Sequence, residues 1–214
     1  MILANPATSA PAQEMIALDN VSWELYDMLL DETSEQHVRI TYDNGRMVIM
    51  SPLPIHDLVK GFLGRLIEMA TLEWNIPLRS YGSTTWKRQD LAKGLEADES
   101  YFIQHEQAAQ GLKYDWDSAK MPPPDLVVEV DLRHIPIERS KIYAALGVPE
   151  IWRFDGEKVE FLLLNASGQY ETISHSHALA RISSADVNDF LHLLGTVDDT
   201  RLMRQIRDWL RTLG

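Results

Sequence analysis

The sequence DLVVEVDL at residues 125–132 limits the possible folds of this chain more than any other stretch. Side chains alternate between the two faces of a β-strand, so the acidic residues of this run share one face and its leucines share the other. The valines on both sides of Glu129 predict that the strand crosses the interior of a sheet. A buried carboxylate without a partner is unfavourable unless it binds a proton. We therefore expect a positive charge above Glu129 and Asp131.

Two kinds of positive charge fit this position. Periodicity alone favours an Arg or Lys in a structural ion-pair network, and a divalent metal ion is the alternative. A metal needs further oxygen ligands, which the acidic run Glu96-Ala97-Asp98-Glu99 supplies, although such a run is usually a solvated turn. If the two strands are neighbours, Asp98 lies opposite Glu129. A site with few, hard oxygen ligands favours Mg²⁺ or Mn²⁺.

Residue usage argues against several other chemistries. The chain contains no cysteine, which removes disulfides, thiolate zinc sites and thiol nucleophiles and fits a reducing compartment such as the cytoplasm. His134, His175 and His177 are scattered without an HExxH spacing, so histidine-based zinc is poorly supported. No run approaches the ~18 apolar residues that cross a bilayer, so we expect no membrane partner. Residues 1–20 lack a basic start and an apolar core, which predicts a flexible leader.

The net charge limits how the chain can meet nucleic acid. Lys and Arg total 20 against 32 Asp and Glu, so the formal charge is −12. Such a field repels a polyanion and argues against a protein that coats nucleic acid through bulk electrostatics. It still permits an enzyme that engages one phosphodiester locally through a metal and a few cations.

Hydrophobic periodicity and turn residues predict one domain over residues 21–214. The clearest element is a long helix over 56–74, where apolar residues recur at three- and four-residue steps. Asp43-Asn44-Gly45 and Asp155-Gly156 predict hairpin turns, and Gly147 predicts the end of a helix. The other predicted helices cover 21–30, 137–146, 184–194 and 200–213, and the other predicted strands cover 37–42, 46–50, 79–88, 98–104, 150–154 and 158–164, with 89–94 in a loop. This order predicts an α/β or α+β fold with a central mixed β-sheet flanked by helices.

Several blocks resemble a known bacterial family. EADESYFIQ at 96–104, PPPDLVVEVDL at 122–132 and ERSKIYAALGVPEIWRFDGEKV at 138–159 are similar to blocks of the Uma-type family of restriction-endonuclease-like proteins. STTWKRQDLAKGLEADESYFI at 83–103 is similar to its middle block. The resemblance covers roughly residues 37 to 192, and the order and spacing of the blocks make it specific.

The resemblance implies the PD-(D/E)XK nuclease fold, a restriction-endonuclease-like core with metal-dependent hydrolysis of phosphodiesters. Asp98 matches the first Asp of the motif and Glu129 its second acid, both metal ligands. His56 matches a His commonly found at the start of the long helix, where it orients or assists near the metal. Without the family, His56 would be taken for a partly exposed residue at a helix start.

Two positions depart from the family pattern. Ala97 stands where the family has Pro before the first Asp, which keeps the ligand but loosens its turn. Asp131 stands where the superfamily has Lys, and Arg139 matches the basic residue on the following helix that stands in for it. Arg does not deprotonate, so it stabilises developing negative charge but cannot act as a base.

The leading hypothesis is a DNA endonuclease. Asp98, Glu129 and the carbonyl of Val130 would hold Mg²⁺ or Mn²⁺, with Asp131 in the metal's water shell. Arg139 or Lys141 would balance the negative charge at the scissile phosphate, with Lys87 as a further alternative. The other interpretation of each of these three residues is a surface charge or an ion-pair partner.

Two other hypotheses stay open. One is an inactive nuclease fold that serves as a binding or scaffolding module, which the acidic charge and the missing strand lysine favour. The other is a metal-dependent phosphohydrolase acting on small nucleotides, which tolerates the acidity best. By analogy with restriction-type nucleases that cut both strands, a homodimer is expected.

Overall fold

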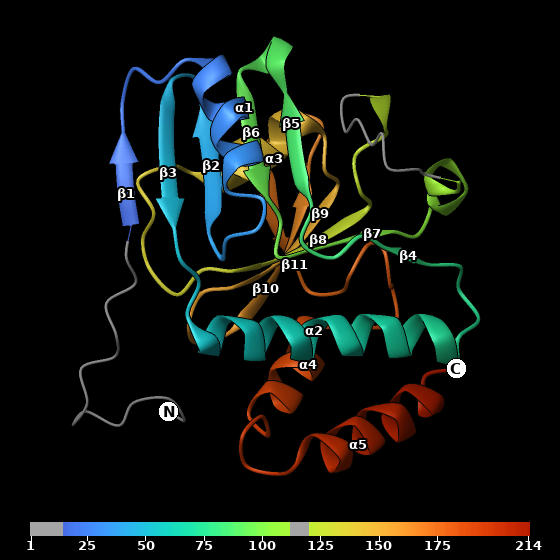
Figure 1. The fold of residues 1–214 in the computed structure, drawn as a ribbon. Helices are drawn as coiled ribbons and strands as arrows, with labels where there is room; N and C mark the ends of the chain where they lie inside the picture. The colour runs from blue at the N-terminus through green and yellow to red at the C-terminus, as the bar shows by residue number, and fades with distance from the viewer. Residues whose placement is uncertain (1–14, 112–119) are drawn as a thin grey trace, which may run out of the picture.

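The computed structural model describes residues 15–111 and 120–214, which form two β-sheets and five α-helices (Figure 1). The first sheet contains, in spatial order, β1 (Met15–Leu18), β3 (Arg46–Met50), β2 (Arg39–Asp43), β6 (Lys93–Glu96) and β5 (Thr85–Arg88). The second contains, in spatial order, β11 (Tyr170–Ile173), β10 (Val159–Leu164), β9 (Glu150–Phe154), β8 (Leu126–Val130), β7 (Glu99–Phe102) and β4 (Arg79–Ser80). The helices are α1 (Trp23–Glu32), α2 (Pro54–Glu73), α3 (Arg139–Leu146), α4 (Ser184–Leu191) and α5 (Asp199–Thr212), with short 3-10 turns η1 (Gln89–Leu91) and η2 (Glu106–Ala109).

The second sheet is mixed, as the sequence predicts. Its neighbouring strands are antiparallel except β8 and β9, which run parallel because α3 carries the chain back between them. Gly147 ends α3 with a φ of 82°, a left-handed conformation that favours glycine. The predicted mixed α/β architecture is therefore confirmed.

The two faces of β8 have different surroundings. Leu126, Val128 and Val130 pack in the main hydrophobic core with α2, which lies along the second sheet (Figure 1). Val127 packs in another core with α3 and with strands of the first sheet. The alternation predicted from the sequence is confirmed, and Glu129 shares the face of Val127.

The chain passes from one sheet to the other at Ala97 and Asp98. β6 ends at Glu96 in the first sheet and β7 begins at Glu99 in the second. Ala97 is fully buried, and its N–H donates a hydrogen bond of 3.2 Å to the carbonyl of Thr84. A proline could not donate this bond, so a backbone hydrogen bond holds the turn that was expected to be loose.

The structure differs from the sequence prediction between residues 79 and 96. The strand predicted over 79–88 is two strands, β4 and β5, which belong to different sheets. Residues 93–96, partly assigned to a loop, form β6, which pairs antiparallel with β5. Ala92 makes this tight return possible with a φ of 50°, a conformation that its residue type does not signal.

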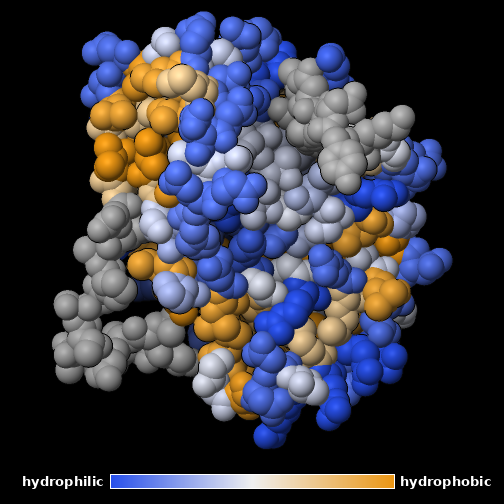
Figure 2. Space-filling model, in the orientation of Figure 1, coloured by the Kyte–Doolittle hydropathy of each residue, from blue (hydrophilic) through white to orange (hydrophobic). Residues whose placement is uncertain are grey.

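The N-terminal edge of the first sheet is apolar. Residues 15–18, within the predicted leader, form β1 and pair with β3, whereas residues 1–14 lie outside the described residues. Figure 2 shows an apolar area at this edge, where Met15 and Ile16 of β1 and Met28 of α1 are exposed. Within the described part of the chain, no helix is long and apolar enough to span a membrane.

Candidate active site

Asp98 is fully buried at the crossing between the two sheets. The register of β7 against β8 pairs Glu99 with Val128, so one further step places Asp98 beside Glu129. Asp98 Oδ2 accepts a hydrogen bond of 2.8 Å from the N–H of Val130. The predicted meeting of the two acidic positions across neighbouring strands is confirmed.

His56 reaches the same carboxylate from the first turn of α2. Its Nε2 lies 3.0 Å from Asp98 Oδ2, and the residue is only 2% exposed. The reading of His56 as a partly exposed helix-start residue is therefore wrong, because α2 begins at Pro54 against the sheet and turns this side chain inward. Burial raises the pKa of Asp98, but the bond from His56 and the charges of His56, Arg139 and Arg39 outweigh it and hold this pKa below its ordinary value.

Glu129 is held by two groups from one face of α3. Arg139 Nη2 donates a 2.8 Å hydrogen bond to Glu129 Oε1, and the hydroxyl of Tyr143 donates to the same oxygen. Arg139 and Tyr143 are one helical turn apart, which places both side chains over β8. Both are buried, and Arg139 Nη2 also donates a 2.6 Å bond to the carbonyl of Glu96. The helix thus supplies the positive charge that the sequence required.

Two carboxylate oxygens at this site have no hydrogen-bond partner among the described residues. They are Asp98 Oδ1 and Glu129 Oε2, both inaccessible to solvent. Burial and the charges of Asp98 and Asp131 raise the pKa of Glu129 well above its ordinary value, although Arg139 and Tyr143 oppose this. Glu129 is therefore short of positive charge even with Arg139 in place.

Asp131 and Arg39 are two further charged residues near Asp98 and Glu129. Asp131 is half-buried on the Glu129 side of the strand, and burial raises the pKa of its carboxyl. Arg39, from β2, forms an ion pair with Glu96 and places its Nε 3.8 Å from Asp98 Oδ1. Sequence reasoning missed Arg39 because nothing local links β2 to residue 98. It also missed Tyr143, although the four-residue step from Arg139 was a usable signal.

The other predicted helpers lie elsewhere. Lys141 is exposed on α3, and its Nζ pairs with Glu138 at 2.6 Å. Lys87, on β5, forms an ion pair with Asp27 of α1. Neither is brought to the carboxylates, because α3 directs Arg139 and Tyr143 inward and Lys141 outward. Of the three basic candidates, the structure places only Arg139 at Glu129.

The residues at this site fit a small divalent cation, but they offer it few protein ligands. Within residues 15–111 and 120–214, no group of three or more His, Asp or Glu side chains is arranged to hold a metal. The fit instead depends on the oxygens of Asp98 and Glu129 that accept no hydrogen bond from the described residues, together with the backbone at Val130, whose N–H already bonds Asp98. Two carboxylates and a carbonyl suit Mg²⁺ or Mn²⁺, which complete their shells with water and substrate oxygens.

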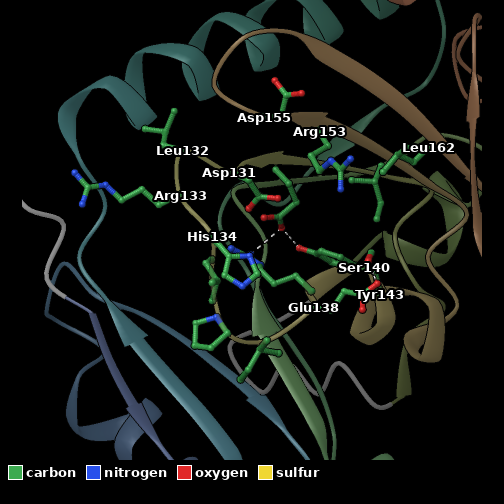
Figure 3. A pocket seen from close by; sticks show the side chains of 16 residues that line it. Asp131, Leu132, Arg133, His134, Glu138, Ser140, Tyr143, Arg153, Asp155 and Leu162 are labelled. Carbon is green, nitrogen blue, oxygen red and sulfur yellow. Dashed lines mark hydrogen bonds and ion pairs between the residues drawn. The ribbon is translucent and has the colours of Figure 1, made fainter. Parts of the chain in front are cut away.

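A cavity of about 670 Å³ opens on this face of β8. Glu129 and Arg139 line it, and so do Asp131 and His134, which Figure 3 labels together with Arg133 of the loop after β8. Arg153 of β9 completes the wall next to β8 (Figure 3). Glu129 and Asp131 therefore border a space large enough for part of a substrate.

Comparison with known proteins agrees with this geometry. A family model described as "Uma2: Putative restriction endonuclease" matches residues 23–191, which confirms the resemblance inferred from the sequence. A solved structure, described as "a putative nuclease belonging to DUF820" from Anabaena variabilis, is similar with a TM-score of 0.51 and 14% sequence identity. The match covers 70% of this chain and 89% of that one, and at this identity it establishes the fold alone. No curated protein matches the chain.

Proposed function

The chain belongs to the Uma2 restriction-endonuclease family, and from this premise we propose that it is a divalent-metal-dependent endonuclease that hydrolyses phosphodiester bonds of DNA. The observation that carries the proposal is that neighbouring strands bring together two buried carboxylates, Asp98 and Glu129, each with one oxygen that has no hydrogen bond among the described residues, and that Glu129 lines an open cavity. Leaving two acidic oxygens without a hydrogen bond in the interior is costly in free energy, and such costs persist where a ligand relieves them.

Asp98, Glu129 and the carbonyl of Val130 are the proposed ligands of Mg²⁺ or Mn²⁺. When bound, the ion would lower the pKa of a coordinated water and polarise a phosphate oxygen. Each ligand is fixed by the protein: the N–H of Val130 and His56 orient Asp98, while Arg139 and Tyr143 orient Glu129. Such fixed contacts keep ligands in place without reorganisation during the reaction.

Arg139, Asp131 and His56 have separate proposed roles at the site. Arg139 stays protonated and stabilises negative charge that develops near Glu129, but it does not remove a proton. Asp131 stands at the position of the missing lysine and faces the cavity, where its carboxylate would orient water near the ligands. His56 acts through Asp98 and is therefore a positioning residue.

Plasmid nicking tests the proposal. The purified protein should nick supercoiled DNA with Mg²⁺ or Mn²⁺ and not with EDTA. Asp98→Asn should abolish nicking, because the amide keeps an oxygen for the N–H of Val130 and removes the charge. Asp98→Ala should do the same, with loss of that bond as well. Asp90→Asn is the matched control, since Asp90 is exposed and pairs with Arg88 on the surface. Nicking by Asp98→Asn at the wild-type rate would refute the assignment.

A second candidate is a binding or scaffolding module without activity, and one observation favours it. Arg139 already occupies one oxygen of Glu129, and Asp131 replaces the lysine that the superfamily places on this strand. A module of this kind would show no nicking by the wild-type protein and no change of melting temperature with Mn²⁺. The same measurements therefore separate the two functions.

A further inference from the structure

Arg153 lies next to the proposed catalytic carboxylate in space. β8 and β9 run parallel with Glu129 in register with Arg153, so both side chains emerge on the same face of neighbouring strands, which lie about 4.8 Å apart. Both residues line the same cavity, and Arg153 projects into it beside Asp131 (Figure 3). The substrate that reaches Glu129 therefore also meets a guanidinium.

Glu160, the carboxylate that binds Arg153, is shared with a second cation. Arg153 Nη2 donates a 2.9 Å hydrogen bond to Glu160 Oε2 on β10. Lys158 Nζ lies 3.0 Å from the other oxygen of the same carboxylate, so two cations share one negative charge. Arg153 Nε is buried and has no hydrogen-bond partner in the described parts of the chain. The group formed by Arg153, Lys158 and Glu160 therefore carries a net positive charge.

Three of the four acidic residues that line the cavity have a partner other than Arg153, whereas the fourth, Asp131, lies beside Arg153 and interacts with its charge. Glu129 is bound by Arg139, and Glu138 pairs with Lys141 outside the cavity. Asp155 accepts two 2.9 Å bonds from backbone N–H groups of its own turn. The Arg153 side chain is 37% exposed at the cavity, so an anion can reach its guanidinium even though the chain as a whole is acidic.

We propose that Arg153 binds a phosphate of the DNA strand that is cut, and so gives the site local affinity for its substrate. The inference rests on the proposed nuclease function. A planar guanidinium with several N–H donors matches the oxygens of a phosphate better than an ammonium does. A contact of this kind explains how an acidic protein holds a polyanion at one place: the attraction is confined to the cavity beside the reacting bond.

The experiment compares two variants that each remove one positive charge from Glu160. Arg153→Gln removes the cation inside the cavity, whereas Lys158→Gln removes an exposed cation outside it, and in each case the other cation stays on Glu160. Both proteins should therefore fold. Fluorescence anisotropy of a labelled DNA duplex, without metal and over about 50 to 200 mM NaCl, gives the affinity and its salt dependence.

Arg153→Gln should weaken binding by about tenfold and reduce the slope of log K against log salt by about one, the signature of one lost phosphate contact. Arg153→Lys should recover most of the slope, and Lys158→Gln should match the wild type. In nicking assays Arg153→Gln should raise KM by about tenfold and change kcat by less than about threefold.

The outcomes separate this inference from the function on which it rests. Wild-type nicking combined with the same salt slope in Arg153→Gln and Lys158→Gln would overturn the role of Arg153 and leave the nuclease intact. Absence of wild-type nicking would refute the nuclease by itself, while a smaller slope in Arg153→Gln would still support the phosphate contact. A wild-type protein that binds no DNA in the anisotropy assay overturns the phosphate contact, and the nicking assay with metal then decides the nuclease separately.

Discussion

Tyr143→Phe tests the physical core of the site, because it removes one oxygen atom and leaves the packing of a buried ring unchanged. The hydroxyl donates to Glu129 Oε1, and the ring is fully buried. A hydrogen bond to a charged group contributes roughly 1.5–3 kcal/mol. Glu129 Oε1 keeps Arg139 as a donor at 2.8 Å, so we expect the lower end, about 1.5 kcal/mol. At roughly 2–4 °C per kcal/mol for a chain of this size, the melting temperature should fall by about 3–6 °C.

The effect should depend on pH with a definite sign. The pKa of Glu129 is already raised in the folded protein, chiefly by burial, and the bond from Tyr143 lowers it. Loss of that bond raises the folded pKa further while the unfolded pKa stays the same. A carboxyl with a raised folded pKa loses stability as pH rises from its unfolded value through its folded value. The deficit of Tyr143→Phe should therefore be small near pH 4.5 and largest above the folded pKa.

Tyr26→Phe is the matched control. Tyr26 is also fully buried, but its hydroxyl has no hydrogen-bond partner within the described residues. Removing an unsatisfied hydroxyl should leave stability unchanged or increase it, without dependence on pH between 4.5 and 8. Thermal melts of the three proteins across this range provide the assay. An equal decrease in both variants, or a Tyr143→Phe deficit that is constant with pH, would refute the electrostatic account of Glu129.

Three further predictions follow from the same structure. If Mn²⁺ binds with a Kd of about 1 mM, wild-type protein in about 10 mM Mn²⁺ should melt about 3–6 °C higher than in EDTA. Glu129→Gln should not show this rise in melting temperature, and an equal rise in the variant would contradict the ligand assignment. Gly94→Ala should destabilise the fold by about 1–3 kcal/mol in denaturant melts, because the new methyl group would meet the buried ring of Tyr26 at 2.8 and 2.9 Å. Gly61→Ala, inside α2 with no heavy atom within 4 Å of the new methyl group, should instead raise stability by about 0.5–1 kcal/mol.

Local patterns in the sequence determined much of the fold. The alternation in residues 125–132 predicts which face of β8 packs against α2, since side-chain direction in a strand repeats every two residues. The hairpin at Asp43-Asn44-Gly45 follows from residues that accept positive φ, 49° at Asn44 and 87° at Gly45. The long helix and the glycine that ends α3 are likewise local features. Each of these depends on neighbours within a few residues.

The tertiary structure alone decided how the site is completed. The sequence required a positive charge above Glu129, but it did not identify the donor as Arg139 rather than Lys141, because that choice depends on which face of α3 meets β8. It did not place Arg39 near Asp98 or Arg153 beside Glu129, since those distances follow from strand order and register. Local periodicity states which side chains must be buried, whereas the packing of distant segments decides which of them meet. For this reason the acidic residues of the site could be identified from the sequence, whereas their partners could be identified only from the folded structure.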